Sequence, residues 1–352
     1  MTRLKNHTVT FLKTLSQTFF FSHPIFGLLL LMLLSVFDFQ LFLFSLISAM
    51  LGYLSTVITK TPFVLKEWGL ITINSFFFGS AMKTFFLSDP LFYFYLLAGA
   101  VLIPVVCKAS VEILQHWKIS PFVLPYILTT WMLCLITPSH EAHSFVAQPT
   151  DPRITSWISE LMMNFGSDST LLVAILKISL SAFEGLGRVF FLPNPFFGLS
   201  LFLLVSLFRP KLSLFFLGGL LVGSLTSHLL TGGSLDWENG SLNFCSGLIG
   251  LGLASYEERF QPTKILGFCS LSSFISIALS HLFRSSELPL LTLPYVLTLW
   301  IALLSQIPKL NFSWRSKNSL DRNEPSMRHP QTSGEPLFIR SNPSQLPEQI
   351  SL

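Results

Sequence analysis

Long apolar runs separated by short polar breaks fill the sequence from about residue 10 to residue 308. Runs such as 25–37 and 212–230 are almost free of charged residues. A membrane-spanning helix needs about 20 apolar residues, and fewer where it is buried in a bundle. Because backbone polar groups must be satisfied within lipid, continuous runs favour helices, whereas a transmembrane barrel would show weak alternation. The pattern predicts an all-α polytopic membrane protein with ten transmembrane helices.

The runs fall into two series with the same order: a short element that ends at a proline, followed by five spans. We expect the spans at 25–37, 41–59, 69–82, 91–107 and 121–137, and again at 196–208, 212–230, 241–255, 264–282 and 289–308. The short elements, 11–23 and 182–194, have too few apolar residues to cross alone. They are predicted to enter the membrane and turn back as re-entrant pore helices, a path tolerated only inside protein or along a water-filled cavity.

An internal repeat accounts for this order. "QTFFFSHPIFG", which starts at Gln17, and "RVFFLPNPFFG", which starts at Arg188, lie 171 positions apart and share five of eleven residues. "LPYILTTW" and "LPYVLTLW" share six of eight residues at an offset of 169. These matches predict a first repeat, a polar linker, a second repeat and a cytoplasmic tail whose polar composition favours disorder. Their expected bounds are 10–137, 138–179, 180–308 and 309–352.

Five spans per repeat is an odd number, so the second repeat is predicted to be inverted in the membrane. With the N-terminus inside, the predicted inner loops carry most of the basic residues: Lys60, Lys66, Lys108, Lys118, Arg209, Lys211, Arg259 and Lys264. The predicted outer connections carry only Lys83, Arg153 and Arg284. This distribution follows the positive-inside rule and supports the inverted orientation.

Composition narrows the possible functions. The chain is 51% hydrophobic and 11% charged, whereas a soluble domain averages roughly 25% charged residues. Its net charge of +4 fits cytoplasmic loops and not nucleic-acid binding. The four cysteines have no metal-ligand spacing and are expected to be packing residues. With no catalytic constellation, phosphate-binding loop or relay of acidic residues, we predict neither an enzyme nor an ATP-driven pump, and no cofactor or metal.

Candidate binding chemistry lies at the two re-entrant elements. Phe20 and Phe191 occupy matching positions and are candidate pore-lining rings, although most of the 36 phenylalanines must face lipid or fill the core. The last carbonyls of the short helices are expected to be unpaired. Aromatic walls with acceptors along one edge suit a small planar solute with N–H donors. Glu184 and Arg188, four apart, are predicted to form an ion pair, either functional or neutralised near the interface. His23 is expected either to gate by protonation or to cap the next helix.

These stretches resemble the urea transporter family. "GRVFFLPNPFFG" is similar to its Gln- or Glu-Val-Phe-Phe helix and Asn-Pro turn, "GSLNFCSGLIGLGLA" to its Gly-Leu-Tyr-Gly-Phe-Asn-Ala stretch, and "LPLLTLPYVLTLW" to its Leu-Pro-x-x-Thr-Leu-Pro-Phe signature. The resemblance covers about residues 10–308. It implies a homotrimer with one pore per subunit and a channel without energy coupling. The family's filter residues correspond here to Gln17, Phe20, Val123, Arg188, Phe191, Phe244 and Thr292.

Two of these positions depart from the family pattern. Arg188 offers only hydrogen-bond donors, and Val123 lacks the hydroxyl of the family's threonine. The leading hypothesis is a passive channel for urea, or a related small neutral amide, in the plasma membrane (the inner membrane if the source is bacterial). Two alternatives remain: a coupled transporter of another small solute that uses Arg188, and a non-conducting member of the family.

Overall fold

The computed structural model describes residues 2–58, 65–86, 89–117, 119–137, 179–180, 182–230, 244–256, 259–283 and 288–306. Met1–Gln306 forms one compact unit. The predicted tail and nearly all of the predicted linker lie outside the described residues. Every regular element among the described residues is helical, which confirms the predicted all-α class.

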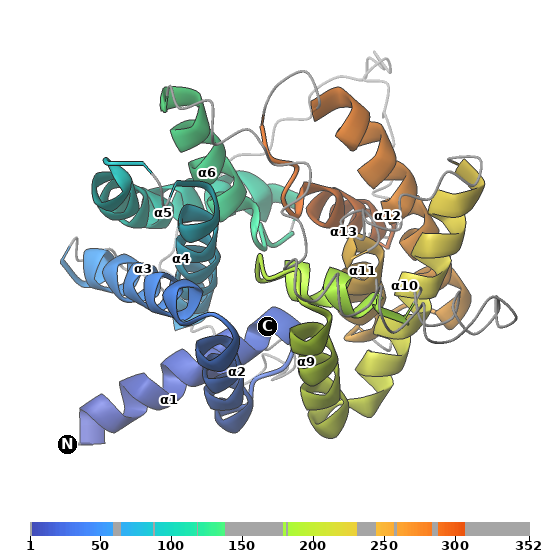
Figure 1. The fold of residues 1–352 in the computed structure, drawn as a ribbon, viewed down its shortest axis with the longest axis horizontal. Helices are drawn as coiled ribbons and strands as arrows, with labels where there is room; N and C mark the ends of the chain where they lie inside the picture. The colour runs from blue at the N-terminus through green and yellow to red at the C-terminus, as the bar shows by residue number, and fades with distance from the viewer. Residues whose placement is uncertain are drawn as a thin grey trace, which may run out of the picture. The chain divides into compact units, whose positions relative to one another are not determined.

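The first series of helices comprises α1 (Thr2–Ser16), the short 3₁₀ helix η1 (Gln17–Phe19), α2 (Pro24–Phe37), α3 (Phe39–Ile58), α4 (Leu65–Phe86), α5 (Phe92–Leu114), η2 (Gln115–Trp117) and α6 (Leu124–Ile136). The second comprises a helical segment at 182–188, then α9 (Pro195–Phe208), α10 (Pro210–Leu230), α11 (Phe244–Ala254), α12 (Pro262–Phe283) and α13 (Leu293–Ser305) (Figure 1). Each predicted span therefore contains a helix. The first short element is longer than predicted, because no Gly or Pro interrupts the polar residues that precede residue 11.

The helices differ in whether they are long enough to cross a bilayer. Three described stretches are long and apolar enough to do so alone: Phe92–Trp117, Pro210–Ser227 and Pro262–Phe283. Taken together, Thr8–Phe19 and Pro24–Phe37 would also be long and apolar enough to cross. However, the chain bends by 78° at the break between them. Five further apolar helices, α6 and α13 among them, have 10–17 residues. A 13-residue helix is only about 20 Å long, so these helices suit a bundle that surrounds them with protein.

Glycines allow the helical segments before the two proline breaks to pack closely on the helices that follow them. A Cβ added to Gly27 in α2 would overlap the backbone carbonyl of Leu12 in α1. At the matching place in the second half, a Cβ on Gly198 in α9 would overlap the carbonyl of Phe183. Small residues are typical where membrane helices approach this closely. In both halves, therefore, the backbones of the two successive helical segments come into close contact at a glycine.

The two halves meet through matching contacts. Helix α6 contacts α13, and the indole Nε1 of Trp131 donates to the carbonyl of Pro289 at 2.8 Å. Trp300, which matches Trp131 in the sequence repeat, donates to the carbonyl of Ser120 at 3.0 Å. Such an exchange, in which each half gives the same bond to the other, is the contact pattern of a twofold-related pair.

Helices α2 and α9 lie side by side and make a second set of matching contacts (Figure 1). The ring of Phe37 meets Phe197 with centroids 5.5 Å apart, and the ring of Phe208 meets Phe26 at the same distance. Both pairs are edge-to-face, the arrangement favoured by aromatic quadrupoles. The helices that follow the two proline breaks therefore form a shared aromatic core.

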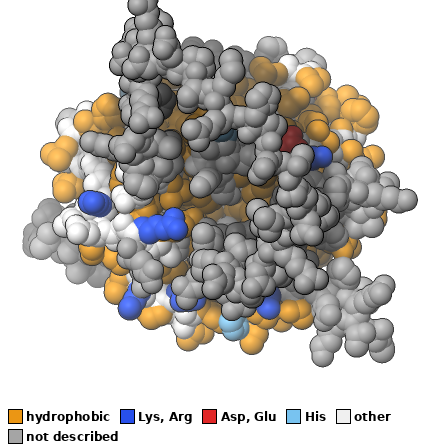
Figure 2. Space-filling view, turned by 180° about the vertical axis from the view of Figure 1, so that it is seen from behind, with side chains coloured by type: hydrophobic (Ala, Val, Ile, Leu, Met, Phe, Trp, Pro, Cys, Tyr) orange, Lys and Arg blue, Asp and Glu red, His pale blue; other side chains and the backbone are white. Residues whose placement is uncertain are grey.

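Large apolar side chains cover much of the described surface. Val36, Leu207 and Tyr93 are 80%, 77% and 73% exposed. On the face seen in Figure 2, hydrophobic side chains make up most of the described surface, and Lys and Arg side chains lie mainly in its lower part. Extended apolar patches of this kind mark a surface that meets lipid or another protein.

Candidate solute site at the two proline-broken helices

Two phenylalanines adopt a backbone conformation that bulky residues rarely take. Phe20 has φ 63° and Phe191 has φ 59°. A left-handed conformation costs a non-glycine residue roughly 1–3 kcal/mol and persists only where the surroundings impose it. The two residues match in the sequence repeat, and each closes a turn: Phe20 N donates to Gln17 O and Phe191 N to Arg188 O, both at 2.9 Å. The chain therefore reverses in the same way at both breaks.

These turns correct one expectation. The carbonyls of Gln17 and Arg188 are engaged by the backbone N–H of residues three positions later. The last carbonyls of these short helices were predicted to be unpaired, because the end of a helix leaves carbonyl groups without a partner inside the helix. The left-handed residue instead folds its own N–H back onto the helix end. Each carbonyl oxygen keeps a second lone pair.

The rings of Phe20 and Phe191 each contact residues of the opposite half. Phe191 makes edge-to-face contacts with Phe85 at 5.7 Å and with Tyr126 at 6.5 Å between centroids. A Cβ added to Gly252 in α11 would lie 3.0 Å from Cζ of Phe20. Both rings are partly buried. The structure thus places each predicted lining ring against the other half, where a path between the halves would run.

The neighbouring rings have a different role. Phe19 and Phe190 are fully buried and stack on each other at 6.1 Å with an interplanar angle of 27°. Phe190 also contacts Phe77 at 5.6 Å. In each Phe-Phe pair of the repeat, the first ring therefore fills the core between the halves. Only the second ring, Phe20 or Phe191, remains available as a wall.

The two helix breaks are completed differently. In the second half, Oδ1 of Asn194 accepts from the backbone N–H groups of Phe196 and Phe197 and so caps α9. His23 occupies the matching position but makes no capping hydrogen bond, so the capping alternative is wrong. Its ring lies 4.9 Å from that of Phe208, and its buried Nδ1 has no partner among the described residues. An imidazole ring is wider than an asparagine amide and packs on the aromatic core instead.

Gln17 and Arg188 also differ in their surroundings. Oε1 of Gln17 lies 2.8 Å from the position that a Cβ on Gly69 of α4 would take. Arg188 Nη2 donates to Glu184 Oε1 at 2.6 Å, which confirms the predicted ion pair. Both charged side chains are only 12% exposed, and Arg188 Nε has no partner among the described residues. Arg188 is thus largely buried and held along its own helix by Glu184.

A second pair of turns precedes α6 and α13. Phe122 and Leu291 have φ 49° and 50°, so they too are left-handed. Val123 and Thr292 follow them as the first capping residues of the two helices. The hydroxyl of Thr292 is 2.7 Å from that of Tyr126, which lies in the other half. Since Tyr126 also touches Phe191, one tyrosine links the predicted residues Phe191 and Thr292.

Asn74 in α4 fixes the first of these turns. Its Nδ2 donates to the carbonyl of Phe122 at 2.9 Å and to that of Leu70 at 2.8 Å. Its Oδ1 accepts from the backbone N–H of Tyr126 at 3.0 Å. One fully buried side chain therefore positions the turn that presents Val123. Sequence reasoning missed Asn74 and Tyr126, whose roles depend on contacts between residues about 50 to 170 positions apart.

Phe244 stands apart from the other predicted residues. It is the first residue of α11 and is 7% exposed. No ring in the described part of the chain makes an aromatic contact with it, and residues 231–243, which precede it, are not described. The structure therefore brings Phe191 and Thr292 together through Tyr126. It does not join Phe244 or Gln17 to that group.

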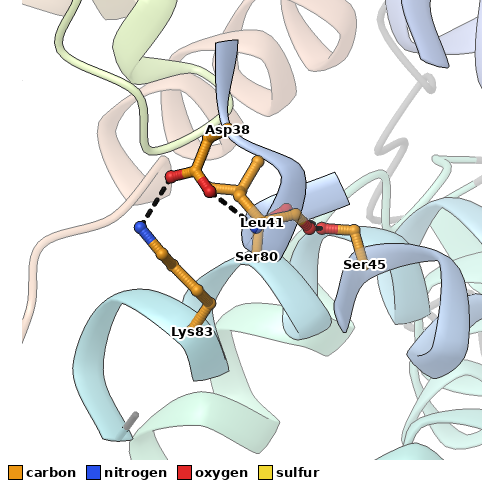
Figure 3. A network of polar contacts seen from close by, with 5 residues as sticks. All are labelled: Asp38, Leu41, Ser45, Ser80 and Lys83. Carbon is orange, nitrogen blue, oxygen red and sulfur yellow. Dashed lines mark hydrogen bonds and ion pairs between the residues drawn. The ribbon is translucent and has the colours of Figure 1, made fainter. Parts of the chain in front are cut away.

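An ion pair joins the connection between α2 and α3 to the C-terminal end of α4. Asp38, between α2 and α3, accepts from Lys83 Nζ at 2.7 Å and from the backbone N–H of Leu41 at 2.9 Å (Figure 3). Nearby, the hydroxyls of Ser45 and Ser80 are 2.7 Å apart and join α3 to α4. Lys83 was predicted to be one of few basic residues on the outer side, and its partner Asp38 belongs to a connection predicted to be on the same side.

Basic residues at other helix ends lie over aromatic rings. The guanidinium of Arg209 is 5.9 Å from the ring centre of Phe21, and that of Arg259 is 5.9 Å from the ring centre of Tyr256. Burial raises the pKa of Tyr256 to about 12, an effect that the positive charge of Arg259 partly offsets. The phenol is therefore neutral at physiological pH and presents an uncharged aromatic face to the guanidinium of Arg259.

Within the described residues, no three His, Cys, Asp or Glu side chains come close enough to hold a metal ion. The four cysteines are buried and unpaired, as expected of packing residues. The chain thus has the apolar helices of a membrane protein, and the two segments before its proline breaks meet at Phe19 and Phe190.

The comparison with family models gives the family. Residues 8–307 match the model described as urea transporter, so the chain belongs to the urea transporter family. It is accordingly a multi-pass membrane protein of a transport family and not of an enzyme family. A search of curated proteins found no match.

Proposed function

We propose that this chain is a passive channel for urea or a closely related small amide. The observation that carries the proposal is the pair of matching left-handed turns, each of which sets a phenylalanine ring against the other half. A strained residue is retained where surrounding structure and function require it. Two such residues, related by the repeat and lying in a member of the urea transporter family, support a filter at this place.

In the proposed mechanism, the solute sheds water and slides between the flat faces of Phe20 and Phe191. Hydrogen-bond acceptors along one edge take over from water, including the second lone pairs of the Gln17 and Arg188 carbonyls and the hydroxyl of Thr292. Binding must be weak enough for the solute to leave, so several modest sites in series serve better than one tight site. No ion or nucleotide is required.

We further propose ten spans arranged as two inverted repeats around this path. The matching φ angles, the reciprocal bonds of Trp131 and Trp300, and the reciprocal aromatic pairs of α2 and α9 all support a twofold relation. The pairing of Asp38 with Lys83 supports the predicted outer side. From the family, we propose a homotrimer with one pore in each subunit, in a plasma membrane or bacterial inner membrane.

Arg188 is the residue that most directly tests this function. Its guanidinium is engaged by Glu184, which supports a pair with no net charge that leaves the path open to neutral solutes. The partnerless Nε favours the alternative, in which Arg188 binds a carbonyl or negatively charged group of another solute in a coupled transporter. The non-conducting member of the family is retained as a third hypothesis because the family's Gln or Glu is replaced by Arg188 in one half and its Thr by Val123 in the other.

Stopped-flow light scattering of proteoliposomes under a urea gradient tests the proposal. We compare the wild type with Phe191→Leu, Arg188→Gln and Phe274→Leu. Phe274 is 55% exposed on α12, so its substitution controls for removing a ring without altering the turn. We expect fast, non-saturating urea flux in the wild type and in Phe274→Leu, with at least a fivefold loss in Phe191→Leu, because a flat wall becomes a branched side chain.

Other outcomes would contradict the proposal and support one of the alternatives. Saturable flux that follows an ion gradient would indicate a coupled transporter. If the wild type showed no urea flux and Arg188→Gln gained it, the pore would be intact but its filter would no longer accept urea. No flux in either protein would favour the non-conducting reading.

A further inference from the structure

Two tyrosines distinguish this chain at the centre of the molecule. Tyr126 and Tyr295 match in the sequence repeat, and each follows a Leu-Pro pair. The family signature that these stretches resemble has phenylalanine there, which has no hydroxyl. The chain therefore carries two phenolic hydroxyls beside the residues that correspond to the filter. Each phenol can donate one hydrogen bond and accept others.

The hydroxyl of Tyr126 already has a partner. It is 2.7 Å from Oγ1 of Thr292, across the boundary between the halves. Whichever hydroxyl donates, the pair keeps one unused O–H and several free lone pairs. The bond also limits the rotation of the Thr292 side chain. Tyr126 thus orients the one threonine hydroxyl that the constriction retains, while its ring supports Phe191.

Tyr295 has the same place in the second half, but its hydroxyl has no hydrogen-bond partner among the described residues. The repeat counterpart of Thr292 is Val123, which has no hydroxyl to offer. Tyr295 as a whole is 6% exposed, but its hydroxyl is not among the fully buried polar atoms that lack a partner, so the oxygen keeps some accessible surface. Tyrosine is used at buried positions when its hydroxyl finds a partner.

The Tyr295 hydroxyl also lies beside the proposed aromatic wall. A Cβ added to Gly252 would be 3.6 Å from Oη of Tyr295 and 3.0 Å from Cζ of Phe20. The hydroxyl and the edge of the Phe20 ring are therefore near the same point on α11. Gly252 has no side chain that would separate them.

From this geometry we propose that Tyr295 is a solute-binding residue of the constriction. Its hydroxyl replaces the threonine hydroxyl that Val123 lacks, and Tyr126 is a positioning residue for Thr292. The proposal deepens the proposed function and rests on it. A small amide passing Phe20 would meet the Tyr295 hydroxyl on one side and the hydroxyl pair of Tyr126 and Thr292 on the other, so hydrogen bonding continues through the narrowest part.

Flux measurements on three variants test the role of Tyr295. We measure urea, formamide, glycerol and water permeability in proteoliposomes of wild type, Tyr295→Phe, Tyr295→Phe/Val123→Thr and Phe274→Leu. We expect Tyr295→Phe to lower amide permeability about three- to tenfold, as loss of one hydrogen bond to the passing solute implies. The double variant has a threonine hydroxyl at position 123 and a phenylalanine at position 295. It should therefore recover most of the amide permeability. Phe274→Leu should behave as wild type.

A readout that does not depend on flux separates binding from folding. Thermal unfolding in detergent should change little in Tyr295→Phe, because the lost hydroxyl has no partner among the described residues. In Tyr126→Phe it should shift down, because Thr292 loses its bond. A Tyr295→Phe variant that unfolds at a much lower temperature, with no recovery of flux in the double variant, would show a structural role and overturn the proposal.

The failure of this proposal and of the proposed function can be told apart. Wild-type flux of formamide or water but not of urea, reduced by Tyr295→Phe, would remove urea as solute and keep Tyr295 in the path. Urea flux that Tyr295→Phe leaves within a factor of two would keep the channel and overturn the role of Tyr295. A wild type that conducts none of the four solutes overturns both.

Discussion

The turns before α6 and α13 have nearly the same backbone and very different side-chain support. Phe122 and Leu291 are left-handed within a degree of each other. In the first half, Asn74 makes three hydrogen bonds to the surrounding backbone. In the second half its counterpart is Cys245, whose thiol lies beside the backbone of Tyr295. The second turn therefore lacks the amide that fixes the first, while both turns receive a bond from a tryptophan of the other half.

The two bent helices differ in the same manner. The first has Lys13 and Gln17 where the second has Glu184 and Arg188. The second pair neutralises itself within one helical turn, whereas Gln17 carries no charge and lies against the backbone of α4. The halves thus share their backbone and core contacts, and they have diverged where side chains reach the candidate path. Substitutions at matching positions can separate the shared features from the diverged ones.

The largest effect is expected where the halves are most alike. Gly198→Ala and Gly27→Ala would each force a Cβ into a backbone carbonyl of the preceding bent helix. Backbone cannot move aside as a side chain tip can, so the helices must separate. We expect each variant to lose more than about 3 kcal/mol of stability, or not to fold, as overpacking at a rigid contact implies. Detergent-solubilised yield and thermal unfolding measure this loss.

Gly267→Ala provides the matched control for both glycine variants. Gly267 also lies in an apolar helix, α12, and nothing approaches within 4 Å of a Cβ placed there. Alanine is the better helix former by about 1 kcal/mol, so this variant should be neutral or slightly stabilised. If Gly27→Ala were tolerated and Gly198→Ala were not, close packing at the bend would be a property of the second half alone.

The ion pair of the second bent helix should give the next largest effect. Glu184→Gln keeps an acceptor oxygen but leaves the Arg188 guanidinium without its counter-charge, at a site where both side chains are 12% exposed. Breaking a buried pair in this way costs about 3–5 kcal/mol, whereas replacing both partners is often nearly neutral. We therefore expect Glu184→Gln to be strongly destabilised and Glu184→Gln/Arg188→Gln to recover most of the stability in detergent unfolding.

This comparison has a clear contrary outcome. If Glu184→Gln were as stable as wild type, Arg188 would not need the negative charge of Glu184, and the self-neutralised pair would be the wrong description. The double variant would also give the second helix the glutamine of the first helix. Equal urea flux in wild type and double variant would then show that the solute does not distinguish Arg188 from a glutamine at the same position.

Asn74 and Cys245 test the difference between the two turns directly. Asn74→Ala leaves the buried Phe122 carbonyl and Tyr126 N–H unpaired, and each such group costs about 1–3 kcal/mol. We expect a loss of about 2–4 kcal/mol. Cys245→Ala removes one small apolar atom group and should cost about 1 kcal/mol or less. Similar losses in the two variants, measured by thermal unfolding, would mean that Asn74 does not fix its turn.

The sequence predicted the features that depend on local spacing. Apolar runs located the helices, and a separation of four residues identified the Glu184–Arg188 pair. It named Phe20 and Phe191 as candidate lining rings, but it could not show that Phe19 and Phe190 are core residues, because packing between the halves decides this. Nor could it find the bond between Tyr126 and Thr292, which are 166 positions apart. The capping prediction for His23 failed because an aromatic partner was available.

The smallest effect is expected at the ion pair that only the first half has. Lys83→Met removes the partner of Asp38, but the side chains are 22% and 16% exposed, and Asp38 keeps the N–H of Leu41 (Figure 3). Accessible ion pairs contribute about 0–1 kcal/mol, so we expect a loss within that range in detergent unfolding and no change in urea flux. Lys83→Arg, which keeps the charge, should match wild type. A loss as large as that of Glu184→Gln would mean that Asp38 is as buried in the assembled protein as Glu184, and that both halves depend on an enclosed charge pair.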